Sequence, residues 1–351
     1  MPHFFTVILS AAEPEADLLP VAEALLAQTF DDFECIIASR SSALGKLAAR
    51  DERLALLEPA LDGAEADRAD PAALYNRALA RAEGRYLCFL DERTIPAPEW
   101  LGELHDAAGR TGADLVACGY TEARGGKKPD RQVTRPAVSL NSPEAFAGIL
   151  TELLGAGLGD MLWNKAYRRG VVTGRGLSFP AGNGMPSGAG RLFDAAFYAG
   201  VHHFCFVDQC LLHRAAPVRR YKPDAFEAAS AFYQAICALY ESYGRLAGRN
   251  ESQLSYLYLM DVVSCIDALG ARDCPLSWHK RRRRVREMLR DERVRRAIFS
   301  CEEKAILPQL LLSVMRTRLI FPNRLLSRLI CSRPAARWLP ALRHKRLGAG
   351  L

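Results

Sequence analysis

The residues with the clearest capacity for chemistry follow a short apolar run, YLCFL, at residues 86–90. Asp91 and Glu92 could supply carboxylate oxygens to Mg²⁺ or Mn²⁺, because these ions accept water in their remaining positions. Arg93 brings a guanidinium, which binds phosphate bidentately and stays charged at any relevant pH. A guanidinium beside Asp91 would repel a bound cation, so this segment predicts either a metal ion or a phosphate group as its ligand.

A second group with chemical capacity lies in the segment DMLWNKAYRR, residues 160–169. Trp163 could stack on a sugar ring, and Lys165 could contact a phosphate. The alternative is a tryptophan in the core beside a solvated lysine, as the usual burial of these residue types favours. Both interpretations stay open at this point.

The elements that must position these residues alternate between strand and helix. Apolar runs without alternation are typical of strands covered on both faces, and the segments between them carry one apolar helical face. Such alternation over about 120 residues indicates a mostly parallel sheet, with ligands at the carboxyl ends of its strands. The expected strands are residues 4–9, 33–38, 54–57, 86–90 and 113–118, and the expected helices are residues 17–28, 71–82, 97–110 and 143–154.

Loops and a long helical stretch make up the remainder. Residues 125–135 read as an exposed loop, and residues 179–190 as a Gly- and Pro-rich loop suited to a mobile active-site segment. Helical patterns then occupy residues 226–246, 253–269 and 278–298. We therefore expect an α/β domain over residues 1–222, followed by a helical, basic C-terminal region over residues 223–351.

Three collinear segments carry a resemblance to a known family. The first, residues 6–42, contains QTFDDFE; the second, residues 75–101, runs from YNRALARAEG into FLDER; the third is LWNKAYRR, residues 162–169, followed by GLSF. In this order and at this spacing they resemble the bacterial family 2 glycosyltransferases, inverting enzymes of the GT-A fold. The resemblance implies a Rossmann-like nucleotide-sugar domain and a hexosyltransferase that uses a nucleotide-sugar donor, most simply of the UDP type.

The resemblance also implies roles for individual residues. Its donor-binding positions correspond to Ser39, Arg40, Asn76, Asp91 and Arg93 in this chain, and its acceptor side corresponds to Trp163, Asn164 and Lys165. Asp91 would be the metal ligand for Mn²⁺ or Mg²⁺, although Arg93 occupies the second acidic position of the family's metal motif.

The chain departs from the family where the family does its chemistry. The family's VDDGS at the end of the second strand is replaced by ASRSS at residues 38–42, and no carboxylate stands near Ala189 and Gly190, where the general base is expected. Three interpretations of Asp91 remain open. It holds a metal; or Arg93 and Arg40 replace the metal; or Asp91 only caps the following turn, in a site that no longer binds a donor.

Charge is distributed unevenly along the chain. Residues 279–351 contain 20 Lys and Arg against 5 Asp and Glu, whereas the whole chain has a net charge of +7. Arginines interleaved with apolar residues are typical of helices that lie on an anionic membrane, and the alternative is a solvated helical face. No nucleic-acid-binding motif is present, so we expect no nucleic-acid partner.

The location and function follow as expectations. The N-terminus lacks a basic n-region, and no apolar run is long enough to span a membrane, so we expect a cytoplasmic protein, peripheral on the inner face of the membrane. We expect it to transfer a sugar from a nucleotide-diphosphate donor to a hydroxyl acceptor in cell-surface polysaccharide or lipid-linked glycan assembly. The alternative is a catalytically inactive module of the same fold that binds a glycan or nucleotide, or serves as a partner subunit.

Overall fold

The computed structural model of the chain describes residues 3–11, 17–38, 42–57, 71–123, 130–181, 188–215, 220–301, 306–317 and 319–331. By compactness the chain divides into two units. The α/β unit comprises residues 1–149 and 157–217, and the helical unit comprises residues 150–156 and 218–351. A mostly parallel sheet followed by a helical C-terminal region confirms the architecture predicted from the sequence.

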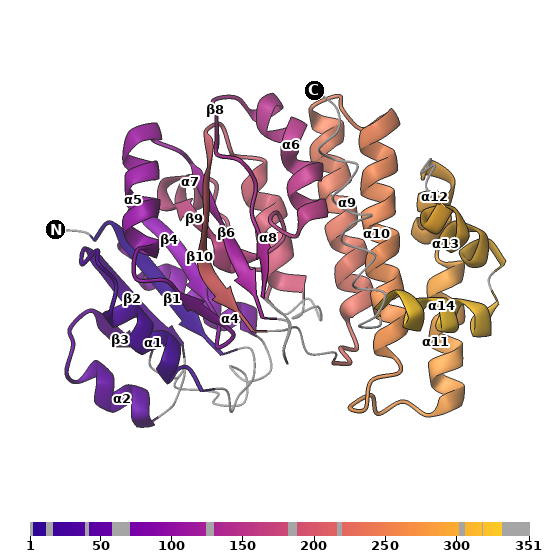
Figure 1. Cartoon of the computed structure of the whole chain (residues 1–351), viewed down its shortest axis with the longest axis horizontal. Coiled ribbons are helices and arrows are strands. Elements are labelled where there is room, and N and C mark those ends of the chain that lie inside the picture. The colour runs from indigo at the N-terminus through magenta and orange to yellow at the C-terminus, as the bar shows by residue number, and fades with distance from the viewer. Residues whose placement is uncertain are drawn as a thin grey trace. The chain divides into compact units, whose positions relative to one another are not determined.

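Four parallel strands form the first half of the sheet (Figure 1). Across the sheet they are β3 (Leu54–Leu56), β2 (Phe33–Ala38), β1 (Phe5–Ser10) and β4 (Tyr86–Leu90). Every residue of β1 and β4 is buried. A strand covered on both faces has no solvent-facing side, which explains why these sequences are mostly apolar and show no alternation.

Helices connect these strands and cover the sheet. They are α1 (Leu19–Leu26), α2 (Ser42–Ala48), α4 (Pro71–Arg81) and α5 (Trp100–Thr111). The apolar face of α5, which includes Trp100, Leu101 and Leu104, is buried, and the helix packs on the second half of the sheet. It ends at Gly112, whose φ of 62° is the left-handed conformation that glycine adopts without strain.

The second half of the sheet contains one reversed strand. That strand, β9 (Lys165–Arg168), lies antiparallel between β4 and β6 (Leu115–Glu122). The next strand, β10 (Phe204–Arg214), runs parallel to β6, and short β5 (Thr94–Pro96) pairs antiparallel with the end of β10. Since β9 is antiparallel to both β4 and β6, β6 runs in the same direction as β4. The carboxyl ends of β1, β4, β6 and β10 therefore all lie at one edge of the sheet.

Short elements complete the α/β unit. They are β7 (Arg131–Val133), β8 (Val138–Leu140), the first part of α6 (Pro143–Ala156), whose residues 150–156 belong to the helical unit, the single 3₁₀ turn η1 (Leu162–Asn164), α7 (Arg169–Gly174) and α8 (Ala189–Tyr198). The prediction of an exposed loop over residues 125–135 is wrong at β7, which pairs with the end of β6. Residues 182–187 of the predicted active-site loop lie outside the described residues.

The helical unit is built around one central helix. Its helices are α9 (Ala225–Ser242), α10 (Gly248–Ala268), α11 (Trp278–Arg290), α12 (Glu292–Ser300), α13 (Ile306–Thr317) and α14 (Ile320–Cys331). Helix α10 contacts α9, α12 and α14 and contributes most of its apolar residues to a buried core. Within that core the rings of Tyr233 and Tyr258 stack with centroids 4.5 Å apart.

The arginine-rich stretch over residues 278–298 forms two helices, where one continuous segment was expected. The break lies at Asp291, whose side chain accepts a hydrogen bond from the backbone nitrogen of Arg293 and thereby caps α12. Among the helices that the structure describes, none combines the length and the apolar character needed to cross a bilayer.

Candidate functional site

Asp91 lies immediately after β4, at the edge of the sheet where the parallel strands end. Its Oδ1 oxygen accepts hydrogen bonds from the hydroxyl of Thr94, at 2.8 Å, and from the backbone nitrogen of Arg93, at 3.1 Å. The same oxygen forms an ion pair with Nη1 of Arg214, a residue at the end of β10. Asp91 therefore closes the turn between β4 and β5 and also binds an arginine that sequence reasoning did not single out.

Arg93 forms hydrogen bonds with Ala215, the residue that follows Arg214 in the sequence. Its Nη2 donates to the carbonyl oxygen of Ala215 at 2.9 Å, and the backbone nitrogen of Ala215 donates to the carbonyl oxygen of Arg93 at 2.9 Å. Burial lowers the pKa of Arg93, and the positive charge of Arg214 lowers it further. The structure thus holds two guanidinium groups near one another at this edge of the sheet.

The surroundings of Asp91 do not form a usual site for Mn²⁺ or Mg²⁺. Such a site gathers several oxygen ligands around the ion. Over the described part of the chain, no group of three or more His, Cys, Asp or Glu side chains is placed to hold a metal. A cation at Oδ1 of Asp91 would have to displace Arg214, and a cation at either carboxylate oxygen would lie close to the positive charges of Arg214 and Arg93, so the residues present do not fit the metal that the resemblance implies.

Trp163 supports Arg214 and is not an open platform for a sugar. Only 6% of Trp163 is exposed. The Cζ atom of Arg214 lies 4.6 Å from the centroid of its ring, and the ring of Tyr120 packs edge-on at 4.7 Å. Because the guanidinium covers one face of the indole, the prediction of Trp163 as an acceptor-stacking surface is corrected to a buried support.

Lys165 is buried and interacts with protein groups. Its exposed fraction is 1%, and Nζ donates to the carbonyl of Met161 and lies 3.4 Å from Oδ2 of Asp194 on α8. Burial lowers the pKa of Lys165 and raises the pKa of Asp194 to about 6. Both sequence interpretations of Lys165, as a phosphate contact and as a solvated lysine, are therefore wrong.

Asn164 and Asn76 hold backbone segments in place. Asn164 is fully buried, and its Nδ2 donates to the carbonyl of Leu158 at 3.1 Å, so it does not face an acceptor. Asn76 accepts from the backbone nitrogen of Phe179 at 2.7 Å and donates to the carbonyl of the same residue at 2.8 Å. Asn76 thus fixes the start of the Gly- and Pro-rich segment. Ser39 and Arg40 lie outside the described residues.

The expected position of the general base is closed to a carboxylate. Ala189 is buried, and a Cβ atom on Gly190 would lie 2.9 Å from Cδ1 of Leu162. A different carboxylate lies next to this helix: Oδ2 of Asp160 is 3.3 Å from Nη2 of Arg191, and 19% of the Asp160 side chain is exposed. Sequence reasoning missed Asp160, although it opens the segment DMLWNK.

Tyr120 lies within electrostatic range of both Asp160 and Arg214. Burial, chiefly, raises the pKa of its hydroxyl to about 12, and the charges of Asp160 and Arg214 both act on that hydroxyl from nearby. Its ring also contacts Trp163. Asp160 and the pair of Asp91 and Arg214 thus both lie within electrostatic range of Tyr120, so an anion could bind here in the region of a proton acceptor.

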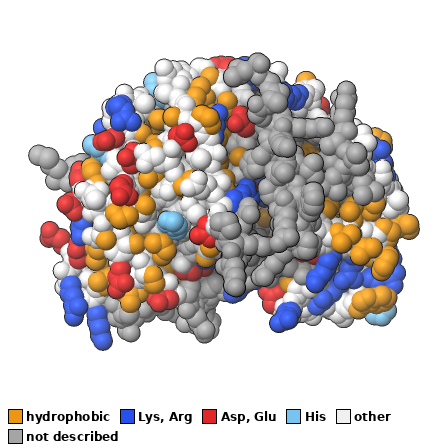
Figure 2. Space-filling model, viewed as in Figure 1, with side chains coloured by type: hydrophobic (Ala, Val, Ile, Leu, Met, Phe, Trp, Pro, Cys, Tyr) orange, Lys and Arg blue, Asp and Glu red, His pale blue; other side chains and the backbone are white. Residues whose placement is uncertain are grey.

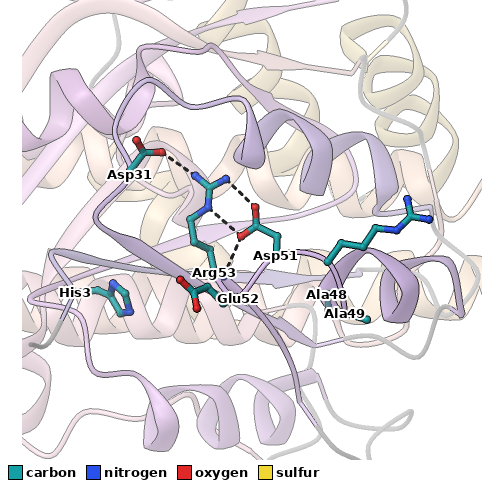
Figure 3. Close-up of a pocket in the computed structure, with 8 residues that line it drawn as sticks. His3, Asp31, Ala48, Ala49, Asp51, Glu52 and Arg53 are labelled. Carbon is teal, nitrogen blue, oxygen red and sulfur yellow. Dashed lines mark hydrogen bonds and ion pairs between the residues drawn. The ribbon is translucent and has the colours of Figure 1, made fainter.

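An open depression of about 1150 Å³ lies at the opposite, amino-terminal edge of the sheet. His3, Asp31, Asp51 and Arg53, which precede β1, β2 and β3, contribute to its lining (Figure 3). Arg53 bonds Asp31 and Asp51, each at 2.9 Å, and its hydrogen bonds lower the pKa of Asp51. Ligands of parallel sheets bind at carboxyl ends, so we interpret this arginine as tying together the loops before β2 and β3.

Comparisons with known proteins agree with the fold. The family described as Glycosyl transferase family 2 matches residues 6–173. EpsH of Bacillus subtilis (strain 168), a protein provisionally named a glycosyltransferase, is 24% identical over 274 residues, or 75% of this chain and 76% of EpsH. Residues 1–349 of S. aureus TarS, solved with UDP-GlcNAc, match with a TM-score of 0.59 at 15% identity, over 93% of this chain and 90% of that chain. The same fragment solved with UDP gives a TM-score of 0.56 at 13% identity, over the same shares of the two chains.

Proposed function

Residues 6–173 match the model of glycosyl transferase family 2, and from this match we propose that the chain is a member of that family and transfers a sugar from a nucleotide-diphosphate donor to a hydroxyl acceptor. The acceptor is a growing cell-surface polysaccharide or a lipid-linked glycan, and the reaction inverts the anomeric centre. The observation that carries the proposal is the joint position of Asp91, Arg93 and Arg214 where β4 and β10 end. Parallel α/β sheets bind nucleotides at this edge.

The described residues support a division of roles. Positive charge from the arginine pair would steady the diphosphate, which gains negative charge as its bond to the sugar breaks. Asp160 would accept the proton of the attacking hydroxyl, because its partly exposed carboxylate lies beside α8 and near Tyr120. Asn76 would act through the backbone of Phe179. Ser39 and Arg40 remain proposed donor contacts.

Release of UDP from a panel of UDP-sugars, in the presence of glycan and lipid-linked acceptors, tests this function. We choose uridine donors because TarS is described in complex with UDP-GlcNAc and with UDP. Asp160→Asn should lower turnover by about 100-fold or more, as loss of a general base does, and should leave donor affinity unchanged. Asp106→Asn on α5, where the carboxylate is exposed, is the matched control. Absence of donor binding across the panel would contradict the proposal.

We also propose that the helical unit contacts an anionic membrane, such as the inner face of the cytoplasmic membrane. All large apolar side chains that are exposed among the described residues belong to this unit: Trp278, Phe299, Leu319, Phe321, Leu325 and Leu329. Three of them follow one another at intervals of four residues and so share one face of α14. Figure 2 shows hydrophobic and basic side chains adjoining one another on this unit.

Arginines accompany this apolar surface and favour anionic lipid over neutral lipid. Arg324 and Arg328 lie on the same helix as the apolar row, and the guanidinium of Arg282 lies 4.4 Å from the ring centroid of Trp278. Apolar side chains would enter the interface while the arginines meet lipid phosphates. Such a surface would bring the enzyme to an acceptor that is itself anchored in the membrane.

Co-sedimentation of the full chain with phosphatidylglycerol vesicles tests the membrane contact. Replacing Phe321, Leu325 and Leu329 by serine should reduce binding at least 10-fold, because burial of each such side chain contributes roughly 1.5–3 kcal/mol. Ser313→Ala on α13 is the control at an exposed position. Binding should also weaken with salt. If the serine variant abolishes self-association of the protein and leaves vesicle binding intact, the surface joins two copies of the chain and the membrane proposal is wrong.

A further inference from the structure

Arg214 is held rigidly, although it lies at the edge of the sheet where a ligand would bind. Its Nη1 atom bonds both Asp91 and the hydroxyl of Thr94, and its guanidinium lies over the ring of Trp163. The pairing of β10 with β5 sets Arg214 opposite Thr94. A side chain fixed in this way loses little further entropy when it binds a ligand.

The guanidinium of Arg214 still has capacity for an anion. Its side chain is 15% exposed, and within the described ranges its hydrogen bonds involve Nη1 alone. Nε and Nη2 each carry donor hydrogens in the planar arrangement that matches the oxygens of a phosphate. The described contacts therefore fix one edge of the group and leave the others able to donate.

The guanidinium of Arg93 is held near that of Arg214, although the two positive charges repel each other. Two backbone-linked hydrogen bonds join Arg93 to Ala215, the residue after Arg214. Asp91 offsets part of the positive charge. A bound anion reduces the repulsion between two like charges that are held together in a partly buried place. A diphosphate has two phosphoryl groups, one for each arginine.

We infer that Arg214 and Arg93 together bind the diphosphate of the donor and take the place of a divalent metal ion. This inference rests on the proposed function and names the groups that supply positive charge in it. Asp91 then acts as a positioning residue, because it orients Arg214 and does not touch the phosphate. Guanidinium stays protonated at every relevant pH, so this charge is permanent.

Isothermal titration with two probes, UDP and inorganic pyrophosphate, tests the inference, each in EDTA and again in MnCl₂. Both probes should bind in EDTA, and Mn²⁺ should leave their affinity unchanged. Arg214→Gln should weaken both about 10- to 100-fold, the usual effect of losing a hydrogen bond to a charged group. Arg93→Gln should act in the same direction while retaining the pair of Asp91 and Arg214. Arg110→Gln, at an exposed position near the end of α5, is the matched control.

The outcomes separate this inference from the proposed function. UDP binding that requires Mn²⁺ and survives Arg214→Gln would overturn the inference and leave the transferase proposal standing. Pyrophosphate binding that depends on Arg214, without binding of any nucleotide or nucleotide sugar, would support the arginine site and overturn the transferase proposal. Failure of both probes to bind in either buffer would overturn both.

Discussion

The buried pair of Lys165 and Asp194 offers a quantitative test of how the acceptor-side segment works. Replacing Lys165 by methionine removes the positive charge and keeps a flexible side chain of comparable length. The side chains of Lys165 and Asp194 are 2% and 0% exposed, and Nζ lies 3.4 Å from Oδ2. After the substitution, the carboxylate would keep only the hydroxyl of Tyr167, at 2.5 Å, as its described hydrogen-bond partner.

The cost of this substitution follows from the pKa of Asp194. Burial raises it to about 6, although Lys165 acts in the opposite direction, so loss of the lysine should raise it further. Above pH 6 the free energy of unfolding that the variant loses relative to the parent should therefore grow with pH, by at most about 1.4 kcal/mol per pH unit. Removal of one partner from a buried pair costs about 3–5 kcal/mol in general. At pH 6 the difference from the parent protein should fall below about 1 kcal/mol.

The direction of the pH dependence follows from linkage. The folded chain holds the proton of Asp194 more tightly than the unfolded chain, so the free energy of unfolding of the parent should fall between about pH 4 and pH 6. In Lys165→Met this fall should continue toward pH 8. Hydrogen exchange of β9 amides in increasing urea measures the free energy at each pH.

The double variant Lys165→Met/Asp194→Asn serves as control for the charge argument. It leaves no uncompensated charge, so it should recover at least about 1–2 kcal/mol of the loss at pH 8. The reasoning is refuted if Lys165→Met changes the free energy of unfolding by less than about 1 kcal/mol while it weakens donor or acceptor binding. That result would mean that Lys165 faces a ligand.

Two further substitutions test the packing that positions the site. Gly84→Ala should prevent stable folding, because a Cβ atom there would lie 2.3 Å from the backbone nitrogen of Thr6. Gly45→Ala, where the nearest contact of the added Cβ atom is 3.8 Å, should be tolerated. Thermal unfolding of the two variants tests this, and equal midpoints would contradict the argument. Asn76→Ala should lower the free energy of unfolding by about 1–3 kcal/mol, because two backbone groups of Phe179 lose their hydrogen-bond partner. Limited proteolysis near Phe179 should become faster, and an unchanged cleavage rate would argue against this role of Asn76.

The sequence was most informative where structure depends on local pattern. The predicted bounds of β2 and β4 agree with the structure, and the predicted bounds of α4 agree to within one residue, because a buried strand needs a run of mostly apolar residues and a one-sided helix needs apolar residues at helical spacing. The strands that were missed, β5, β7 and β8, have three residues each. Strands that short show no period, and their existence depends on hydrogen bonds to distant strands.

The candidate site likewise depends partly on local sequence pattern and partly on contacts between distant residues. The alternation of strand and helix places Asp91 at the carboxyl edge of the sheet, and the sequence alone established this. Arg214 is separated from Asp91 by 123 residues, and only the register between β10 and β5 brings them together. Lys165 carries a charge that usually stays in water, yet the path of β9 through the middle of the sheet buries it. The sequence thus determined which edge of the sheet could bind a ligand, and the tertiary structure decided which charges meet there, because the pairing of side chains far apart in the chain is set by strand register and burial.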